Sequence, residues 1–334
     1  MFGTDQKFKY PDEELTGKES YFVKSSEVPE QTTILGLLRF LILKQKGLLY
    51  PNFRYNEEEK ETINSCIGLN SFCFDKTHKQ DFGYIKKISP VFLMDEAGNY
   101  YVKNPFHNKK GIGYAPIELT EKTIETSSGK IRLPKLGEYD AKKGYASGYY
   151  NLKNGSIHND IFSSIIIPGN RKSDKGTEND SFFKKETIKM KSGYSFAIYV
   201  DLTEDILPKK DIGYMGLGRS AFLITSRPVK ENNLIYYIKS AFSESTELWT
   251  YALSDLFIQG ELSYDTFCIV EEKQIRNLET SYNGENYVKN LRKSEKQFNM
   301  IQKGSVFFGK CNLNIENENC KQIGYNQIVE LGGK

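Results

Sequence analysis

The chain has 334 residues, which favours two domains of roughly 150 residues over a single one. Its 46 lysines and arginines nearly balance 43 aspartates and glutamates, leaving a formal net charge of +3, and its 13% aromatic content argues against disorder. No apolar run reaches the about 18 residues that a membrane-spanning helix needs, and no secretory signal opens the sequence. We therefore expect a soluble, cytoplasmic protein that binds no membrane.

Cysteine and histidine are sparse and scattered. The five cysteines are odd in number and form no CxxC pair, which argues against a disulfide framework and a zinc ribbon. His78, His107 and His158 lie far apart in the sequence and outside any HExxH motif. We expect no cofactor and no metal from these residues, although a carboxylate site for a hard cation stays open.

Two helices are predicted in the first seventy residues. Apolar residues within 34–42 form a broad stripe, with Thr32 or Thr33 as the N-cap of the helix that carries it. The Asn-x-x-Glu spacing that begins at Asn56 predicts the start of a second helix, and Gly68 predicts its end.

The rest of the chain is dominated by predicted strands. Residues 90–102 form a hairpin pattern with turn residues in the middle, while 248–257 fits either a helix or a strand. Further strands are predicted at 161–167, 194–200, 221–225, 234–238 and 306–308. Helices concentrated early, with strands throughout, predict an α+β fold and not a doubly wound α/β sheet.

Positive charge is concentrated in one part of the chain. Residues 76–153 contain fourteen basic and eight acidic residues, with the lysines interleaved with tyrosine and phenylalanine. Such a mixture suits a nucleic-acid backbone together with unstacked bases. A solvated lysine-rich face would have the same composition.

The stretch from Gly213 to Arg219 is the most distinctive local motif. Its order is GxxGxG, so it is not a dinucleotide-binding fingerprint, and the chain contains no P-loop. Glycines at 216 and 218 would let backbone amides approach a phosphate, and Arg219 could add a bidentate contact. A plain glycine turn between two strands explains the spacing equally well.

Arg39 lies inside the predicted first helix, among apolar residues. A charge in that position costs free energy unless it reaches solvent or an anion. It could face RNA beside Gly36, where the missing side chain permits close approach, or it could be a helix-edge arginine paired with a carboxylate.

Several segments, in this order, resemble the RAMP proteins of CRISPR effector complexes. Residues 31–39 match the first-helix pattern TTxxGxxR, and residues 67–72 are similar to the IGxxSF element that follows it. The later matches are the aromatic pair 182–183, the GYSF strand at 193–197, G-x-G-R at 216–219, and the closing elements 304–306 and 323–326. Their order and spacing resemble the third Cmr subunit of type III-B complexes.

The resemblance implies tandem ferredoxin-like (RRM-like) domains: residues 1–185, with an inserted β-hairpin thumb at about 79–140, and residues 186–334, with the glycine-rich loop. It implies a non-catalytic subunit that grips the repeat-derived 5′ tag of the guide crRNA. The implied partners are other Cmr subunits, namely the large polymerase/cyclase-like subunit on which it docks and the backbone RAMP subunit.

On this interpretation we expect a set of RNA contacts, with lysines on the flanks of the thumb and the 92–101 hairpin as a wedge between bases. The residues are Thr32, Thr33, Arg39, Lys87, Lys103, Arg171, Lys172, Gly216, Gly218 and Arg219. The alternative is a metal-independent endoribonuclease that processes CRISPR repeat RNA, with His107 or His158 as its general base.

Overall fold

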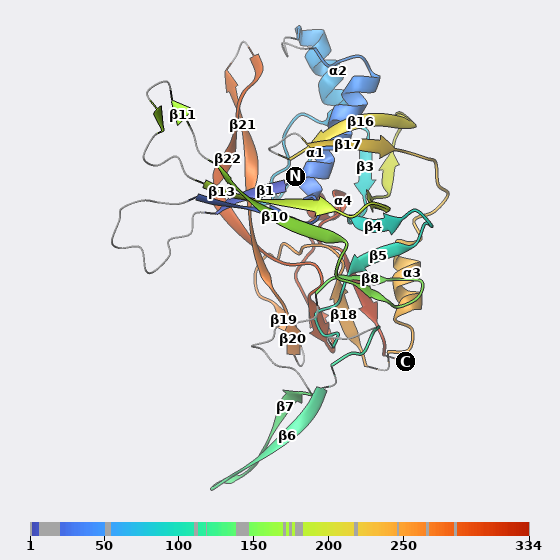
Figure 1. Ribbon diagram of the computed structural model, residues 1–334, viewed down its shortest axis with the longest axis vertical. Helices are drawn as coiled ribbons and strands as arrows, with labels where there is room; N and C mark the ends of the chain where they lie inside the picture. Colours follow the sequence, from blue (N-terminus) through green and yellow to red (C-terminus); the bar gives the residue numbers. More distant parts are fainter. Residues whose placement is uncertain are drawn as a thin grey trace.

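A computed structural model shows a strand-rich α+β protein (Figure 1), which confirms the predicted fold class at that level. The residues that the structure describes are 2–6, 21–50, 55–109, 113–117, 119–137, 147–169, 172–173, 176–177, 183–216, 220–245, 247–264, 267–283 and 286–333.

Helix α1 (Gln31–Gln45) confirms the first predicted helix and buries most of its apolar side chains in the larger of the core clusters. Its predicted cap is wrong. Glu30 is the N-cap residue, and Thr32 and Thr33 lie inside the first turn. The helix therefore begins one residue before the hydroxyl side chains that the sequence offered as caps.

Helix α2 (Glu57–Ile67) begins and ends where the sequence predicted. The Asn56 side chain accepts a hydrogen bond from the Glu59 amide at 2.8 Å, and the Glu59 carboxylate accepts one from the Asn56 amide at 2.9 Å. These reciprocal bonds satisfy two backbone donors that the first turn leaves unpaired. Gly68, with φ of 81°, ends the helix in a conformation that favours glycine.

Two shorter helices lie in the second half of the chain, α3 (Leu234–Ala241) and α4 (Glu318–Gln322). The strand predicted at 234–238 is therefore wrong. Leu234 and Ile238 are 1% and 0% exposed and lie one helical turn apart, so packing against the core selects a helix here despite the β-prone sequence.

Three sheets of four or five strands form most of the fold. The five-stranded antiparallel sheet has the order β14 (Tyr194–Ala197), β4 (Phe92–Asp95), β5 (Tyr100–Lys103), β8 (Tyr149–Asn151), β9 (Ile157–His158). One four-stranded sheet has the order β1 (Phe2–Gln6), β2 (Tyr21–Ser26), β13 (Phe183–Met190), β10 (Phe162–Gly169), and β13 pairs with β2 in parallel. The other has the order β20 (Phe267–Ile269), β23 (Val306–Phe308), β18 (Trp249–Ala252), β25 (Ile328–Leu331).

The remaining strands form antiparallel pairs. They are β3 (Ile85–Ile88) with β15 (Val200–Leu202), β6 (Leu119–Thr126) with β7 (Gly129–Leu136), β11 (Lys172–Ser173) with β12 (Gly176–Thr177), β16 (Lys210–Met215) with β17 (Ser220–Thr225), β19 (Ser263–Tyr264) with β24 (Cys311–Asn312), and β21 (Glu272–Asn283) with β22 (Asn286–Ile301). Strand β18 shows that the ambiguous segment 248–257 contains a strand. Strand β10 confirms the one predicted at 161–167, although three of its residues, Ile165–Ile167, are exposed and not buried.

The two largest core clusters each combine early and late parts of the chain. One joins α1 and α2 to residues between Phe298 and Tyr325. The other joins β4, β5 and β8 to Trp249 and the strands around it. The two halves on either side of residue 185 therefore share their cores, and the domain boundary at that position stays a prediction.

The hairpin predicted at 90–102 exists as β4 and β5, but its predicted role as a wedge between bases is wrong. Phe92 and Tyr101 are 5% and 3% exposed, because this hairpin forms the middle of the five-stranded sheet. The hairpin that projects from the body is β6–β7 (Figure 1), which lies within the range 79–140 predicted for the thumb.

A charged network ties the start of α1 to the C-terminal part of the fold. The Lys273 ammonium lies 2.6 Å from the Glu30 carboxylate and 2.7 Å from that of Asp255. Burial opposes the charge on Lys273, but the two carboxylates outweigh it and raise the pKa of this lysine above its ordinary value. Burial also lowers the pKa of the neighbouring Lys303 to about 8, and Lys273 acts in the same direction.

Replacing Lys273 with methionine should lower the free energy of unfolding by about 3–5 kcal/mol, because Glu30 and Asp255 would lose the cation that they share. Urea unfolding of the full chain measures this. The control is Lys296→Met, which breaks an ion pair to Asp75 whose side chains are 59% and 41% exposed, and which should cost no more than about 1 kcal/mol. Equal losses in the two variants would contradict a structural role for the network.

Candidate nucleic-acid interface

Helix α1 and the β16–β17 pair lie side by side, although they are far apart in the sequence (Figure 1). The Lys44 ammonium lies 2.5 Å from the Asp211 carboxylate, and a Cβ added to Gly213 would lie 2.5 Å from the Leu37 side chain. Lys44, near the end of α1, contacts the early part of β16, whereas Leu37, nearer the start of α1, contacts a later residue of β16. The two elements therefore run antiparallel. The end of β16 at residue 215 therefore lies toward the N-terminal end of α1.

The N-terminal half of α1 has an open stripe on its surface. Gly36 is exposed, and a Cβ at this position would have no heavy atom within 4 Å. Thr32 and Thr33, one turn earlier, and Arg39, three residues later, are partly exposed. Residues three and four apart share a helix face, so these side chains border a bare patch of backbone. A phosphate or sugar could approach the helix closely there.

Contacts on both sides hold the Arg39 guanidinium. It donates a hydrogen bond of 3.0 Å to the Asn70 carbonyl and lies 5.7 Å from the centre of the Phe82 ring. A cation over an aromatic face is attracted by the ring's quadrupole. The arginine is thus oriented at the edge of α1 before any ligand binds, which lowers the entropy that binding would cost.

The outer face of β16–β17 contributes an aromatic ring that the sequence analysis missed. Side chains alternate across a strand, so Gly213 and Met215 face the core while Ile212 and Tyr214 point outward. Tyr214 is 56% exposed, and the next glycine along the chain is Gly216, whose φ of 76° favours glycine. The alternation within the strand could have identified this tyrosine as a surface residue.

Two of the other predicted contact residues, Lys87 and Lys103, lie away from this surface. Lys87 is exposed on β3 and lines a separate groove. The Lys103 side chain is 13% exposed, lies 3.5 Å from the Glu27 carboxylate and stacks over the Tyr149 ring, which leaves little of it for a phosphate. The remaining predicted positions are Arg171, Gly218 and Arg219, which lie outside the described residues, and Lys172, which is described only as part of β11.

The histidines do not form an exposed catalytic group. His107 is 1% exposed, shares a hydrogen bond of 2.7 Å with the Tyr114 hydroxyl, and packs with its ring centre 4.3 Å from that of Trp249. Burial lowers the pKa of His107 to about 3. At neutral pH the ring is neutral, inside the core and out of reach of a substrate.

The ring nitrogens of His158 are both engaged. Nε2 lies 2.9 Å from the Ser156 hydroxyl, and Nδ1 lies 3.2 Å from the Tyr194 hydroxyl. His107 is therefore out of reach of a substrate, whereas His158 is partly exposed and its role as a general base stays untested. Within the described ranges, no group of three or more His, Cys, Asp or Glu side chains is placed to hold a metal ion. Nor does any helix among them have the length and apolar character needed to cross a membrane.

Comparison with known proteins agrees with the sequence motifs. Residues 10–156 match the family model of CRISPR-associated protein (Cas_Cmr3). No curated protein matches the chain. A chain in the cryo-EM structure of the type III-B Cmr-beta bound to cognate target RNA is similar at 13% identity, with a TM-score of 0.49, over 98% of this chain and 92% of that one.

A second chain is from the same assembly with AMPPnP, in state 1. It is similar at 12% identity with a TM-score of 0.45, over 95% of this chain and 94% of that one. At such scores the assignment rests on the sequence match and not on the shared shape. The match, over somewhat less than half of the chain, is to a CRISPR-associated family and agrees with the resemblance that the motifs carry.

The buried histidine makes stability depend on pH. The pKa of His107 is about 3 in the folded chain and about 6.5 when unfolded, so the unfolded state binds one more proton between these values. The free energy of unfolding should therefore fall by about 1.4 kcal/mol for each pH unit below 6.5 through this residue. Urea unfolding between pH 7 and pH 4.5 should show a shallower fall for His107→Gln, and identical slopes would contradict the assignment.

Proposed function

We propose that this chain is a non-catalytic subunit of a type III-B CRISPR ribonucleoprotein. It holds the repeat-derived 5′ tag of the guide crRNA and docks on the large polymerase/cyclase-like subunit, beside the backbone RAMP subunit. The observation that carries the proposal is the family match over residues 10–156, which contains the TTxxGxxR helix. The adjacency of that helix to β16, which precedes the glycine-rich motif in the sequence, supports it, because parts of two motifs then lie close together.

The chemistry of this surface suits a single-stranded RNA end. Splayed bases are recognised by stacking on aromatic rings, and their phosphates by arginines and by backbone amides that lack a neighbouring side chain. Gly36 and Gly216 allow close approach, Arg39 and Arg219 supply charge, and Tyr214 offers a ring on the face of β16 that is turned away from α1. The tandem ferredoxin-like arrangement of the two halves belongs to the same proposal.

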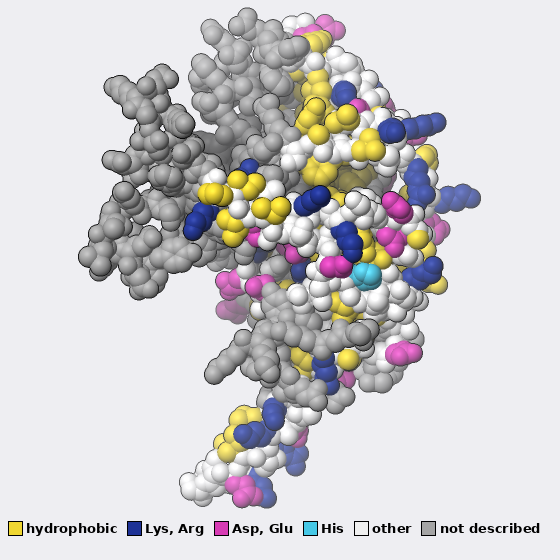
Figure 2. Space-filling view, viewed as in Figure 1, with side chains coloured by type: hydrophobic (Ala, Val, Ile, Leu, Met, Phe, Trp, Pro, Cys, Tyr) yellow, Lys and Arg dark blue, Asp and Glu magenta, His cyan; other side chains and the backbone are white. Residues whose placement is uncertain are grey.

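We assign the role of the thumb to the β6–β7 hairpin. Its faces differ, because Ile124 pairs with Ile131 on one face, while on the other Lys130 lies 3.0 Å from the Glu125 carboxylate. Ile124, Ile131 and Leu133 are 37%, 49% and 43% exposed, and Figure 2 shows hydrophobic and basic side chains together on this hairpin. Aliphatic side chains can enter between bases while flanking lysines hold the phosphates.

Removing the two arginines should weaken RNA binding. We expect Arg39→Ala with Arg219→Ala to lower the affinity for the guide RNA several-fold or more, since each charged contact contributes ~1.5–3 kcal/mol. Filter binding of the guide RNA that copurifies with the assembled complex measures the effect. The matched control is Arg227→Ala with Arg276→Ala, which removes two exposed arginines outside this surface and should change the affinity less than twofold.

A second variant separates RNA contact from folding. Gly36→Glu adds a negative charge at an open position without removing any contact, so it should repel the RNA while the protein keeps its thermal stability. Unchanged RNA affinity in both this variant and the double arginine variant would overturn the proposed interface.

Base unstacking in the bound RNA tests whether the β6–β7 hairpin acts as the thumb. With 2-aminopurine placed in turn at each guide position, one position should fluoresce strongly in the complex because the hairpin unstacks it. Ile131→Ser with Leu133→Ser should abolish that signal. Glu121→Ser with Arg132→Ser, on the opposite face, should preserve it. An unstacked base that survives the first pair of substitutions would assign the wedge to another element.

A further inference from the structure

Strand β10 forms an edge of its four-stranded sheet, and no strand among the described residues pairs with its outer side. Its three isoleucines, Ile165, Ile166 and Ile167, are 58%, 58% and 49% exposed. Neighbouring residues of a strand point to opposite faces, so apolar side chains are exposed on both faces of β10. A long apolar edge of this kind is a template for pairing with another chain. None of the residues proposed above to contact RNA lies on this strand.

The hydrogen-bond pattern shows which backbone groups of β10 face the open side. The Lys191 amide donates to the Ile161 carbonyl at 2.8 Å, where the β10–β13 ladder begins. In an antiparallel pair, residues that bond to the partner strand alternate with residues whose amide and carbonyl point away from it. Counting from Ile161, Ser164 and Ile166 therefore direct both groups outward. Pro168 fits this pattern, because it lacks an amide and lies at an outward position.

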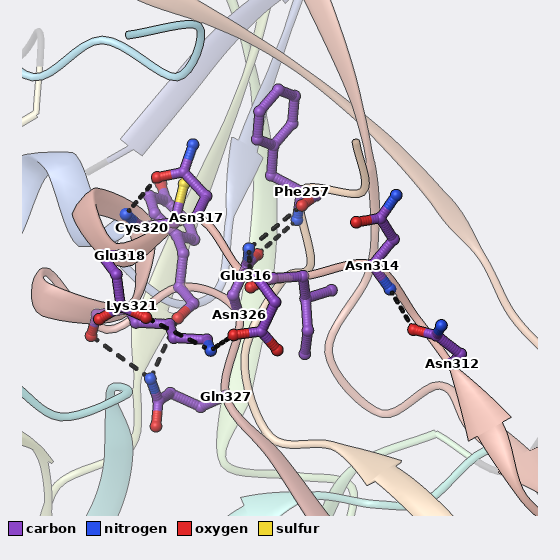
Figure 3. A network of polar contacts seen from close by, with 12 residues as sticks. Phe257, Asn312, Asn314, Glu316, Asn317, Glu318, Cys320, Lys321, Asn326 and Gln327 are labelled. Carbon is purple, nitrogen blue, oxygen red and sulfur yellow. Dashed lines mark hydrogen bonds and ion pairs between the residues drawn. The ribbon is translucent and has the colours of Figure 1, made fainter. Parts of the chain in front are cut away.

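The extended backbone before α4 shows the opposite situation (Figure 3). There the Ile315 carbonyl accepts a hydrogen bond from the Asn326 side chain at 3.1 Å, and the Asn317 carbonyl accepts one from the Lys321 amide at 3.0 Å. That segment is already satisfied within the chain. Within the described structure, by contrast, no hydrogen bond reaches the outward backbone groups of β10. These groups are therefore available to a second backbone.

Lysines lie at both ends of the exposed isoleucines. On β13, Lys189 lies opposite Ser163 at one end, and at the other end Lys185 and Lys184 lie opposite Ile167 and Pro168. Figure 2 shows hydrophobic side chains gathered over β10, with basic side chains at either end. The three lysines are at least partly exposed, and none forms an ion pair with another described residue. Strand β10 has no charged residue, and β13 has one glutamate beside its three lysines.

This distribution of charge distinguishes between possible occupants of the edge. A second copy of this chain, paired antiparallel through β10, would bring the lysines of one copy beside those of the other, which is unfavourable. RNA would meet the lysines, but residues 163–168 contain no aromatic ring on which its bases could stack. A protein strand with aliphatic residues in the middle and carboxylates at both ends complements the backbone, the isoleucines and the lysines together.

We propose that β10 binds an extended segment of a partner protein by strand addition, with aliphatic residues beside the isoleucines and acidic residues at both ends. The backbone of that segment would pair with Ser164 and Ile166. Ser163 and Pro168 are small, so the long lysine side chains of β13 can reach across them to carboxylates on a strand about 10 Å away. The binding goes beyond the proposed grip on RNA and does not depend on it, so the two can fail independently.

The test uses the full chain and a fluorescein-labelled nine-residue peptide that has three valines in the middle and three glutamates at each end. Its order is the same in both directions, so it suits a parallel or an antiparallel added strand. Fluorescence anisotropy should show it binding at least tenfold more tightly than two matched peptides. One has lysines in place of the glutamates, and the other has the same composition with the three valines separated by glutamates.

Substitutions separate backbone pairing from charge. Ile166→Pro removes an outward amide but no bond to β13, so it should weaken peptide binding at least tenfold while the chain keeps its melting temperature. Ile166→Val keeps the amide and should change binding less than twofold. Lys184→Glu with Lys189→Glu should weaken binding at least tenfold, whereas Lys86→Glu with Lys87→Glu, an exposed pair on β3, should change it less than twofold.

Hydrogen exchange identifies the amides that pair with the peptide. Bound peptide should slow exchange at Ser164 and Ile166, because their amides point outward in the free chain. Exchange at residues 313–317 should not change, because that segment is already satisfied by contacts within the chain.

Five outcomes would overturn the proposal. Three are full binding in Ile166→Pro, no preference for the peptide with acidic ends, and protection confined to another part of the chain. The fourth is a dimer of the free chain that dissociates in Ile166→Pro, which would assign the edge to a second copy. The fifth is displacement of the peptide by a ten-nucleotide oligouridine whose own binding is lost in Lys184→Glu with Lys189→Glu, which would make β10–β13 an RNA site.

Discussion

The sharing of one lysine by two carboxylates sets the position of the first helix. Lys273 holds Glu30, the N-cap residue of α1, against Asp255, which follows strand β18. Such networks contribute little net stability compared with apolar packing, but breaking one is costly. We infer that this network selects one placement of α1 over others that the apolar core would tolerate equally well.

Elements that end in capping or turn residues could be predicted from the local sequence alone. The Asn56 capping box and Gly68 delimit α2, and the turn residues between β4 and β5 mark that hairpin, because these patterns act over a few residues. Helix α3 shows the limit of such reasoning. Its β-prone sequence forms a helix because Leu234 and Ile238 must meet the same core, which is a tertiary requirement.

The candidate site was predictable only in part, for the same reason. The motifs pointed to Arg39 and to the turn at Gly216, but nothing in the sequence showed that Leu37 packs against Gly213 and so joins them. Burial reversed other expectations. Phe92 and Tyr101 are buried within a sheet, and Lys103 forms an ion pair with Glu27. A basic and aromatic composition indicates a nucleic-acid-binding surface, but only the exposed residues among them can contact the RNA.

Ion pairs reduce the number of cations that are available to a ligand. Lys44, Lys103 and Lys273 each lie against a carboxylate, so their charge is balanced within the protein itself. A protein that binds RNA alone draws much of its affinity from released counterions, which requires many unpaired cations. Among the described residues of α1 and its C-cap, Lys44 and Lys46 are paired with carboxylates, so the proposed grip on RNA would rely on shape, stacking and a small number of arginines. Such a grip is effective when neighbouring subunits already hold the same strand, because the linked sites raise the effective concentration of the RNA end at this surface.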